Sequence, residues 1–346
     1  MPEHFYLPIF ELTRGGVVEC VHYGSFTVVN THGELLASFG GIESITFLRS
    51  SAKPFQLMPF IEKGGHEYWN FTEREIAILC ASHTGTDDHF AVLKNIQKKI
   101  DITQDDLRCG IHPPIDMPTY KAMIERGEEC TPNRHNCSGK HTGMLAFAKY
   151  INADTTNYID KDHPIQKEIL ECISEISGVD KAQIHIGIDG CSAPVFALPL
   201  RKAAQAYARL CDPVGLPKKR MAACRTITHA MINNPDMVSG PGKFDTRLME
   251  VAKGKIICKG GAQGMQQVGI MPGVIEPTSP GIGIALKISD GDREEKVRPA
   301  VILKILQNLN ALTLNELDQL SDFGPEIQVR NWRNLVVGKG KPLFSL

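Results

Sequence analysis

Strand-like segments lie at both ends of the chain, and helical patterns fill the sequence between them. Residues 16–40 alternate apolar and polar side chains between turns, which predicts an antiparallel meander of short strands. Residues 255–264, 268–270 and 282–288 also have strand patterns, and a closing helix is predicted over about 297–309. We therefore expect an α/β (α+β) fold, in which one sheet is built from both chain termini and a mainly helical middle is inserted into it.

The length of the chain allows two lobes around a shared core. At 346 residues we expect a single domain, with a sheet lobe at approximately 1–50 and 255–346 and a helical lobe at approximately 51–254. Within the helical lobe, Thr72-Glu73-Arg74-Glu75 has the form of a capping box and predicts a helix start. Further helices are predicted over 164–177 and 203–210.

Composition excludes several classes of function. The formal net charge is −1, so nothing indicates a nucleic acid or an acidic membrane as partner. No run of 18 apolar residues occurs, and no basic region leads into an apolar stretch at the N-terminus, so a cytoplasmic protein is expected. The ten cysteines contain no Cys-x-x-Cys pair, which argues against a zinc ribbon and a dense disulfide framework. No glycine-rich nucleotide-binding loop is present either.

A serine and a lysine stand three residues apart in the segment Arg49-Ser50-Ser51-Ala52-Lys53-Pro54. A proline is tolerated in the opening turn of a helix, where its missing N–H leaves no acceptor unsatisfied, so Pro54 predicts a helix start. Ser50 and Lys53 then share one helix face. Because a proline disfavours helical dihedrals at the residue before it, we expect an irregular first turn.

The spacing of Ser50 and Lys53 suits nucleophilic catalysis. A serine hydroxyl attacks well when a nearby base takes its proton, and lysine is a base only when it is neutral. Burial or a second positive charge lowers the pKa of a lysine toward the range of about 7 to 8 that a working base needs. The same pattern also fits an N-cap serine followed by a surface lysine, and the residues alone leave both interpretations open.

Two polar segments adjoin predicted helices. Ser82 and His83 follow an apolar helix, which places them at a site; alternatively, Ser82 and Thr84 only satisfy the carbonyls at the helix end, and Gly85 ends the helix. The segment 136–143 predicts a polar loop that feeds a helix N-terminus, where an anion or an oxyanion would collect. Cys137 and His141 are four residues apart, which suits a metal on a helix face, but two ligands do not complete a site. The alternative is a buried cysteine beside a glycine-rich helix entry.

Two charged residues near the ends of predicted strands are the last candidates for functional side chains. Asp189 follows the predicted strand 184–188 in a glycine turn, where it either serves a site or makes an Asx turn. Lys259 lies on a late strand before Gly260 and Gly261. It is either the second cation that Lys53 requires or a lysine that flanks a hairpin.

Together these segments resemble a known family. An early Ser-x-x-Lys, a second serine and a late Lys-Gly-Gly resemble the layout of serine β-lactamases and penicillin-binding proteins. Over nearly its whole length, however, the chain looks more like the rhizobial-type L-asparaginases, the asparaginase II family with a serine β-lactamase-like fold. The motifs that carry this resemblance, in the order of the family, are Arg49-Ser50-Ser51-Ala52-Lys53-Pro54, Ala81-Ser82-His83, Cys109-Gly110-Ile111-His112-Pro113, Asn136-Cys137-Ser138-Gly139-Lys140-His141, Asp189-Gly190-Cys191 and Lys259-Gly260-Gly261-Ala262.

The resemblance implies an activity and a set of roles. It implies hydrolysis of L-asparagine to L-aspartate and ammonia through an acyl-enzyme, by a cytoplasmic homodimer that needs no cofactor. Ser50 would be the nucleophile and Lys53 its base, and Ser82 with Lys259 would form a second serine–lysine pair. Three further residues would contact or position substrate: Arg49, His141 and Asp189.

The resemblance also implies a zinc ion held by two cysteines and a lysine. Cys137 and Lys140 match two of these ligands, and the third is expected at Asp245, where a carboxylate replaces a thiolate. A hard oxygen in place of a soft sulfur lowers the affinity for zinc and broadens the choice of metal. A weakly held zinc is therefore expected.

Two other classes of function remain open on the sequence. One is a serine amidohydrolase that acts on another amide, such as glutamine or a β-lactam. The other is a binding protein that keeps the same fold without turnover, since one scaffold hosts both catalysts and sensors. Release of ammonia by the purified protein separates these classes.

Overall fold

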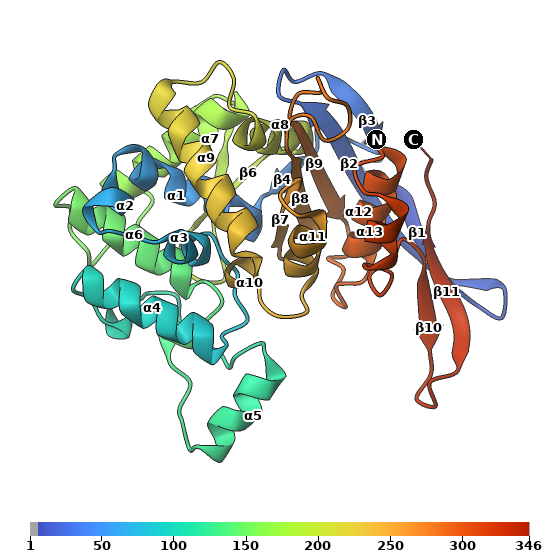
Figure 1. Cartoon of the computed structure of the whole chain (residues 1–346), viewed down its shortest axis with the longest axis horizontal. Helices are drawn as coiled ribbons and strands as arrows, with labels where there is room; N and C mark the ends of the chain where they lie inside the picture. The colour runs from blue at the N-terminus through green and yellow to red at the C-terminus, as the bar shows by residue number, and fades with distance from the viewer. Residues whose placement is uncertain (1–5, 346) are drawn as a thin grey trace. The chain divides into compact units, whose positions relative to one another are not determined.

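The computed structural model of the chain describes residues 6–345 and divides into two compact units (Figure 1). Unit 1 comprises the described parts of residues 1–47, 198–212 and 247–346, so it contains both ends of the chain. Unit 2 comprises residues 48–197 and 213–246.

Unit 1 is built on one antiparallel sheet. Its strand order is β10-β11-β1-β2-β9-β8-β7, and β3 pairs with β2. The strands of this sheet are β1 (Leu7–Arg14), β2 (Val17–Asn30), β3 (Leu35–Phe39), β7 (Ile256–Gly261), β8 (Met265–Ile270), β9 (Ile282–Ile288), β10 (Ile327–Arg330) and β11 (Val336–Pro342). Strand β1 pairs with β11 on one side and with β2 on the other, which confirms the prediction of a sheet built from both chain ends (Figure 1).

Helices cover this sheet closely. Helix α8 (Leu200–Cys211) packs on β2, β8 and β9, and α12 (Val297–Asn308) packs on β1, β9 and β11. At Gly283 of β9, a Cβ would lie 1.8 Å from the Ala204 carbonyl oxygen, so only glycine lets α8 come this close. Every residue of β8 is buried, as expected for a strand covered on both faces. Strand β4 (Ile45–Phe47), α13 (Leu314–Asp318) and the second half of α11 (Phe244–Ala252) also belong to unit 1.

Unit 2 is mainly helical, as predicted for the middle of the chain. Its helices are α1 (Lys53–Glu62), α2 (Gly65–Tyr68), α3 (Glu73–Leu79), α4 (Asp87–Lys99), α5 (Met117–Glu125), α6 (Ser138–Tyr150), α7 (Pro164–Ser177), α9 (Lys218–Asn233) and α10 (Pro235–Val238). Short 3₁₀ turns occur at η1 (Arg49–Ala52), η2 (Gln104–Asp106), η3 (Pro132–Arg134) and η4 (Lys181–Gln183). Strands β5 (His185–Ile188) and β6 (Pro194–Pro199) pair as an antiparallel hairpin.

Helix α1 is the centre of unit 2. It packs against α6, α7 and α9, and all of its residues from Lys53 to Ile61 are buried. Pro54 lies in its first turn as predicted, and the preceding turn, η1, is 3₁₀ and therefore irregular. Lys53 nevertheless has helical dihedrals (φ −58°, ψ −38°), so the expected effect of Pro54 on that residue is wrong. Packing of α1 on three helices outweighs the local steric preference.

The entry of α6 differs from the sequence prediction. A polar loop was expected over 136–143, but the helix begins at Ser138, and only Asn136 and Cys137 of this segment precede it. Buried packing explains the early start, because the residues from Ser138 to Ala148 are all buried. No helix in the described part of the chain is long and apolar enough to cross a membrane.

Candidate active site

The candidate nucleophile, Ser50, lies in η1 next to an ion pair. Arg49 donates from Nε to Asp189 Oδ1 at 2.8 Å, and its Nη2 lies 2.7 Å from the same oxygen. Arg49 has a left-handed φ of 52°. Asp189 Oδ1 also accepts from the Gly190 backbone N–H at 2.9 Å, and the Asp189 carbonyl accepts from the Ser192 N–H at 2.9 Å, so the backbone of Asp189 closes a turn while its carboxylate holds the arginine. Two residues 140 positions apart in sequence thus meet beside Ser50.

Lys53 is buried and contacts the second candidate serine. Its Nζ donates to Ser82 Oγ at 2.8 Å, to the Asn136 carbonyl at 3.4 Å and to the Ala81 carbonyl. Ser82 follows α3, and its backbone N–H donates to the Val238 carbonyl at 3.0 Å. The structure therefore brings Lys53 and Ser82 together, although the resemblance assigned them to different pairs.

A cluster of thiols and one amine lies at the start of α6. Lys140 Nζ donates to Cys191 Sγ at 2.9 Å, and a hydrogen bond joins the Cys191 and Cys137 thiols. This hydrogen bond is the main cause that holds the pKa of Cys137 well below its usual value, with further lowering by the positive charges of Lys53 and Lys140. The same hydrogen bond, with burial, raises the pKa of Cys191. Burial lowers the pKa of Lys140, but the two thiols raise it above its usual value.

The structure groups two of the expected metal ligands with a third residue that was not expected. Cys137 and Lys140 lie together as predicted, and the residue that the structure places with them is Cys191. Asp245 is buried at the start of α11. Among residues 6–345, no three or more His, Cys, Asp or Glu side chains are grouped so that they could hold a metal ion.

His141 is fully buried one turn into α6. Its Nδ1 lies 2.6 Å from the Tyr158 hydroxyl, and its Nε2 has no hydrogen-bond partner among the described residues. Burial is the main cause that holds the pKa of His141 well below its usual value, so the ring is neutral. The Tyr158 hydroxyl also accepts from the Arg108 backbone N–H at 2.7 Å, which fixes the ring that His141 contacts.

Lys259 belongs to unit 1, on strand β7, whereas the other candidate catalytic residues belong to unit 2. Its side chain is 1% exposed, and its Nζ donates to the Gly260 carbonyl at 2.9 Å. A lysine that only flanks a hairpin would lie on the surface, whereas Lys259 is buried.

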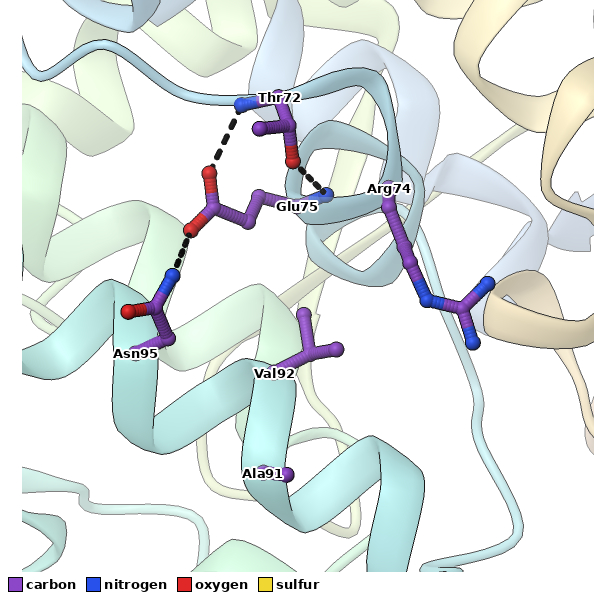
Figure 2. A pocket seen from close by; sticks show the side chains of 6 residues that line it. All are labelled: Thr72, Arg74, Glu75, Ala91, Val92 and Asn95. Carbon is purple, nitrogen blue, oxygen red and sulfur yellow. Dashed lines mark hydrogen bonds between the residues drawn. The ribbon is translucent and has the colours of Figure 1, made fainter.

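A pocket of about 300 Å³ lies elsewhere in unit 2, between α3 and α4 (Figure 2). Figure 2 shows hydrogen bonds among the residues that line it: Asn95 donates to Glu75 at 2.7 Å, and Glu75 also accepts from the Thr72 backbone N–H at 2.7 Å. The second bond belongs to the predicted capping box of α3, which the structure confirms. This pocket contains none of the candidate site residues.

Two contacts of the site do not follow from the sequence. Cys191 was part of a recognised motif, but no pattern in the sequence joined it to Lys140, 51 residues away. The Asn136 carbonyl is an acceptor for Lys53 that no sequence signature marks, because every residue has a backbone carbonyl. A cysteine two residues after a candidate site carboxylate was the one signal that pointed to Cys191.

Solved structures show only distant similarity to this chain. A probable glutaminase from Bacillus subtilis complexed with 6-diazo-5-oxo-L-norleucine is 15% identical, with 78% of each chain covered and a TM-score of 0.34. Another structure of a probable glutaminase from Bacillus subtilis is 11% identical, with 87% of this chain and 86% of that chain covered and a TM-score of 0.37. A Bacillus glutaminase in 4.3 M NaCl is 13% identical, with coverage of 86% and 88% and a TM-score of 0.34. At these scores the similarity establishes no function.

Sequence families give a clearer result. No curated protein is similar enough to this chain to count as a match. The model of the family described as L-asparaginase II matches residues 10–342, which is nearly the whole chain. All six motifs quoted above lie inside the matched range. The chain therefore belongs to the L-asparaginase II family.

Proposed function

We propose that this amidohydrolase converts L-asparagine to L-aspartate and ammonia through an acyl-enzyme on Ser50. The observation that carries the proposal is the ion pair of Arg49 and Asp189 beside Ser50. The Asp189 carboxylate orients the guanidinium, which is 23% exposed and has donors left for a second partner. A guanidinium pairs well with a carboxylate, such as the α-carboxylate of an amino-acid substrate.

The proposed chemistry has two steps. In the first, Ser50 Oγ attacks the side-chain amide carbon while its proton passes to the neutral amine of Lys53; Lys53 then gives this proton to the amide nitrogen, and the carbon–nitrogen bond breaks with release of ammonia. In the second, water gives a proton to Lys53 and attacks the ester carbon; the bond to Oγ breaks, aspartate is released, and Lys53 passes the proton to Ser50 Oγ. Lys53 is the base in both steps; it acts in its neutral form, which has lost one of the three N–H donors described above, and its hydrogen bond to Ser82 holds its position.

Substitution of the two neighbouring serines tests the nucleophile. Ser50→Ala is expected to lower kcat for ammonia release by about a thousandfold or more, as for other nucleophiles. Ser51→Ala is the matched control: Ser51 is fully buried, and its Oγ donates to the Leu48 carbonyl at 2.6 Å. This control is expected to lower stability and to keep activity. A Ser50→Ala enzyme as active as the wild type would reject Ser50 as the nucleophile.

The choice of substrate is tested on the wild-type enzyme. We expect kcat/KM for L-asparagine to exceed that for L-glutamine, and no hydrolysis of a β-lactam. A preference for glutamine would contradict the substrate and leave the nucleophile in place. No ammonia from either amide would favour the non-catalytic binding protein. The names of the similar structures make glutamine the comparison of choice.

Lys259 is proposed as the second lysine of the reaction on the basis of the family resemblance. Lys259→Gln is expected to lower kcat strongly. The matched control is Lys255→Gln: Lys255 immediately precedes the same strand and pairs with Glu316 at 2.7 Å. Equal activities of the two variants would show that Lys259 takes no part in the reaction.

We also propose that the enzyme is a homodimer. Sedimentation equilibrium measures its oligomeric state directly.

A further inference from the structure

Ser82 lies on a segment without regular secondary structure. Residues 81–86 connect α3 to α4 and form neither helix nor strand. Such a segment is held only by hydrogen bonds to its backbone and by its side chains. The side chains of two histidines, His83 and His89, supply several of these bonds.

The two imidazoles hold the segment in the same way. His83 Nδ1 accepts from the Gly85 backbone N–H at 3.1 Å, and His89 Nδ1 accepts from the Thr86 backbone N–H at 3.1 Å. Because a backbone N–H only donates, each Nδ1 must be unprotonated, and the ring proton must lie on Nε2. The two rings stack, with centroids 5.0 Å apart.

The Nε2 atoms connect the segment to the rest of unit 2. His83 Nε2 donates to Ser138 Oγ at 2.8 Å, and Ser138 in turn donates to the Asn133 carbonyl at 3.1 Å. His89 Nε2 donates to the Asp236 carbonyl at 2.9 Å. His83 thus ties the segment of Ser82 to the first residue of α6, next to Cys137.

The surroundings keep both rings neutral. Burial is the main cause that holds the pKa of His83 well below its usual value. The charged and titratable groups near His83 are Lys53 of α1, His135 and Cys137 at the entry to α6, and His89 of α4. Around His89, Asp88 and Asp236 raise the pKa and Arg74 lowers it, but burial is the largest cause and the net shift is downward. A proton on Nδ1 of either ring would remove the acceptor of a backbone N–H.

We propose that His83 is a positioning residue of the active site, whose unprotonated Nδ1 and Nε2–H tie the segment of Ser82 to α6 and so keep Ser82 Oγ on Lys53. This inference rests on the proposed function for its catalytic consequence. It adds to that function a residue that touches neither substrate nor reacting atoms. His89 supports the same segment from the other end.

Replacement of His83 with and without an acceptor tests the proposal. Leucine removes the acceptor, whereas the Oδ1 of asparagine lies about as far from Cβ as Nδ1 does. In H83L, kcat for L-asparagine is expected to fall by about 10- to 100-fold with KM nearly unchanged, because misplaced catalytic groups slow the chemical step. H83N keeps an acceptor for the Gly85 N–H but loses the bond to Ser138, so it is expected to recover part of kcat. A folded H83L enzyme with wild-type kcat, or an H83N enzyme no better than H83L, would overturn the proposal.

His163 provides a matched control. It is also buried, and it also accepts a backbone N–H at Nδ1 (Ile165, 3.3 Å) and lies at Nε2 against a carbonyl (Asp154, 2.7 Å), at the start of α7. H163L is expected to lower the melting temperature and to keep kcat. An equal loss of kcat in H163L and H83L would show a general effect of destabilisation and would overturn the positioning role. Should H83L fail to fold, H83Q replaces it, since its amide reaches Ser138 but leaves no acceptor at the position of Nδ1.

A measurement without turnover separates this inference from the proposed function. Imidazole nitrogen chemical shifts are expected to show the Nε2–H form of His83 between about pH 6 and 8. Amide hydrogen exchange at Gly85 is expected to be faster in H83L than in the wild type and in H83N. If the wild type releases no ammonia, the proposed function fails, and these two signals alone decide the inference. A Nδ1–H form, or an exchange rate at Gly85 that H83L leaves unchanged, would refute it.

Discussion

At the scale of single residues, the structure stores strain next to the candidate nucleophile. Arg49 has a φ of 52°, a conformation that costs a residue with a side chain roughly 1–2 kcal/mol. The ion pair with Asp189 holds the side chain in place. Strain of this kind persists where the surrounding contacts over-determine the backbone, and it concentrates at functional sites.

This strain gives a paired prediction. Arg49→Ala and Arg49→Gly both remove the ion pair, and both are expected to lower kcat/KM strongly. Glycine alone relieves the left-handed backbone, so Arg49→Gly should be more stable than Arg49→Ala by about 1 kcal/mol. Urea denaturation of the two variants measures the difference. Equal stabilities, or a more stable alanine variant, would show that the backbone at this position is unstrained.

The identity of single residues also determines which side chains could bind the expected metal ion. Two thiol sulfurs are donors that zinc prefers, and Lys140 would add an amine nitrogen once it has lost its proton, so Cys137, Lys140 and Cys191 fit such an ion better than a set with Asp245. A zinc ion there would hold the start of α6 to the turn after β5.

Elemental analysis of two variants distinguishes the ligand sets. We expect wild-type protein to contain zinc in less than equimolar amount, Cys191→Ser to abolish the binding, and Asp245→Asn to retain it. Loss of zinc in Asp245→Asn with retention in Cys191→Ser would restore Asp245 as the third ligand. Chelation is expected to reduce kcat only moderately, because the proposed reaction uses no metal-bound water.

At the scale of elements, glycine lets α6 approach α3. A Cβ at Gly139 would lie 2.1 Å from the Ile78 carbonyl oxygen, which is a backbone atom and cannot move aside cheaply. At Gly143, one turn later, the nearest atom is the end of the flexible Leu57 side chain at 3.3 Å. The close approach brings the cluster at the start of α6 next to the segment that follows α3.

Alanine at the two glycines tests this close packing. Gly139→Ala is expected to destabilise unit 2 by about 1–3 kcal/mol, as overpacked cores do, and to lower kcat because Ser82 and Ser138 shift. Gly143→Ala is expected to cost less, since alanine also gains about 1 kcal/mol in helix propensity. Thermal unfolding of both variants measures the order. A Gly139→Ala protein as stable as Gly143→Ala would contradict the contact.

At the scale of the whole molecule, buried neutral histidines make stability depend on pH. Burial is the main cause that lowers the pKa of His83, His89 and His141. Below about pH 6.5 the unfolded chain binds protons at these residues while the native chain does not, so stability is lost as the pH falls. The loss continues until the pH reaches the lowered pKa values of the folded state.

This linkage has a measurable slope. Between about pH 6.5 and 5, each of these histidines is expected to reduce the free energy of unfolding by up to about 1.4 kcal/mol per pH unit. His141→Gln is expected to make this slope smaller by the contribution of one histidine. Urea denaturation at several pH values gives the comparison. An unchanged slope in His141→Gln would mean that the ring is protonated in the native state.

The sequence alone determined the features that depend on neighbouring residues. The predicted strand 282–288 is observed as β9 (Ile282–Ile288), and the helix over 164–177 as α7 (Pro164–Ser177). Pro54 marked the start of α1, because the steric effect of a proline acts within one turn. Residues 16–40 are strands as predicted, since alternation of apolar residues is a property of each strand by itself, but the expected short strands before the turn form one long strand, β2 (Val17–Asn30), which pairs with β3.

Only the tertiary structure decided which side chains meet. Lys53 bonds Ser82 across 29 residues, and Lys140 bonds Cys191 across 51. Neither contact follows from a local pattern, because it depends on how closely α1, α3 and α6 pack and on which rotamers that packing leaves open. The same holds for the protonation of His83 and Cys137, since burial and neighbouring charges set a pKa, and both arise only when distant segments fold together.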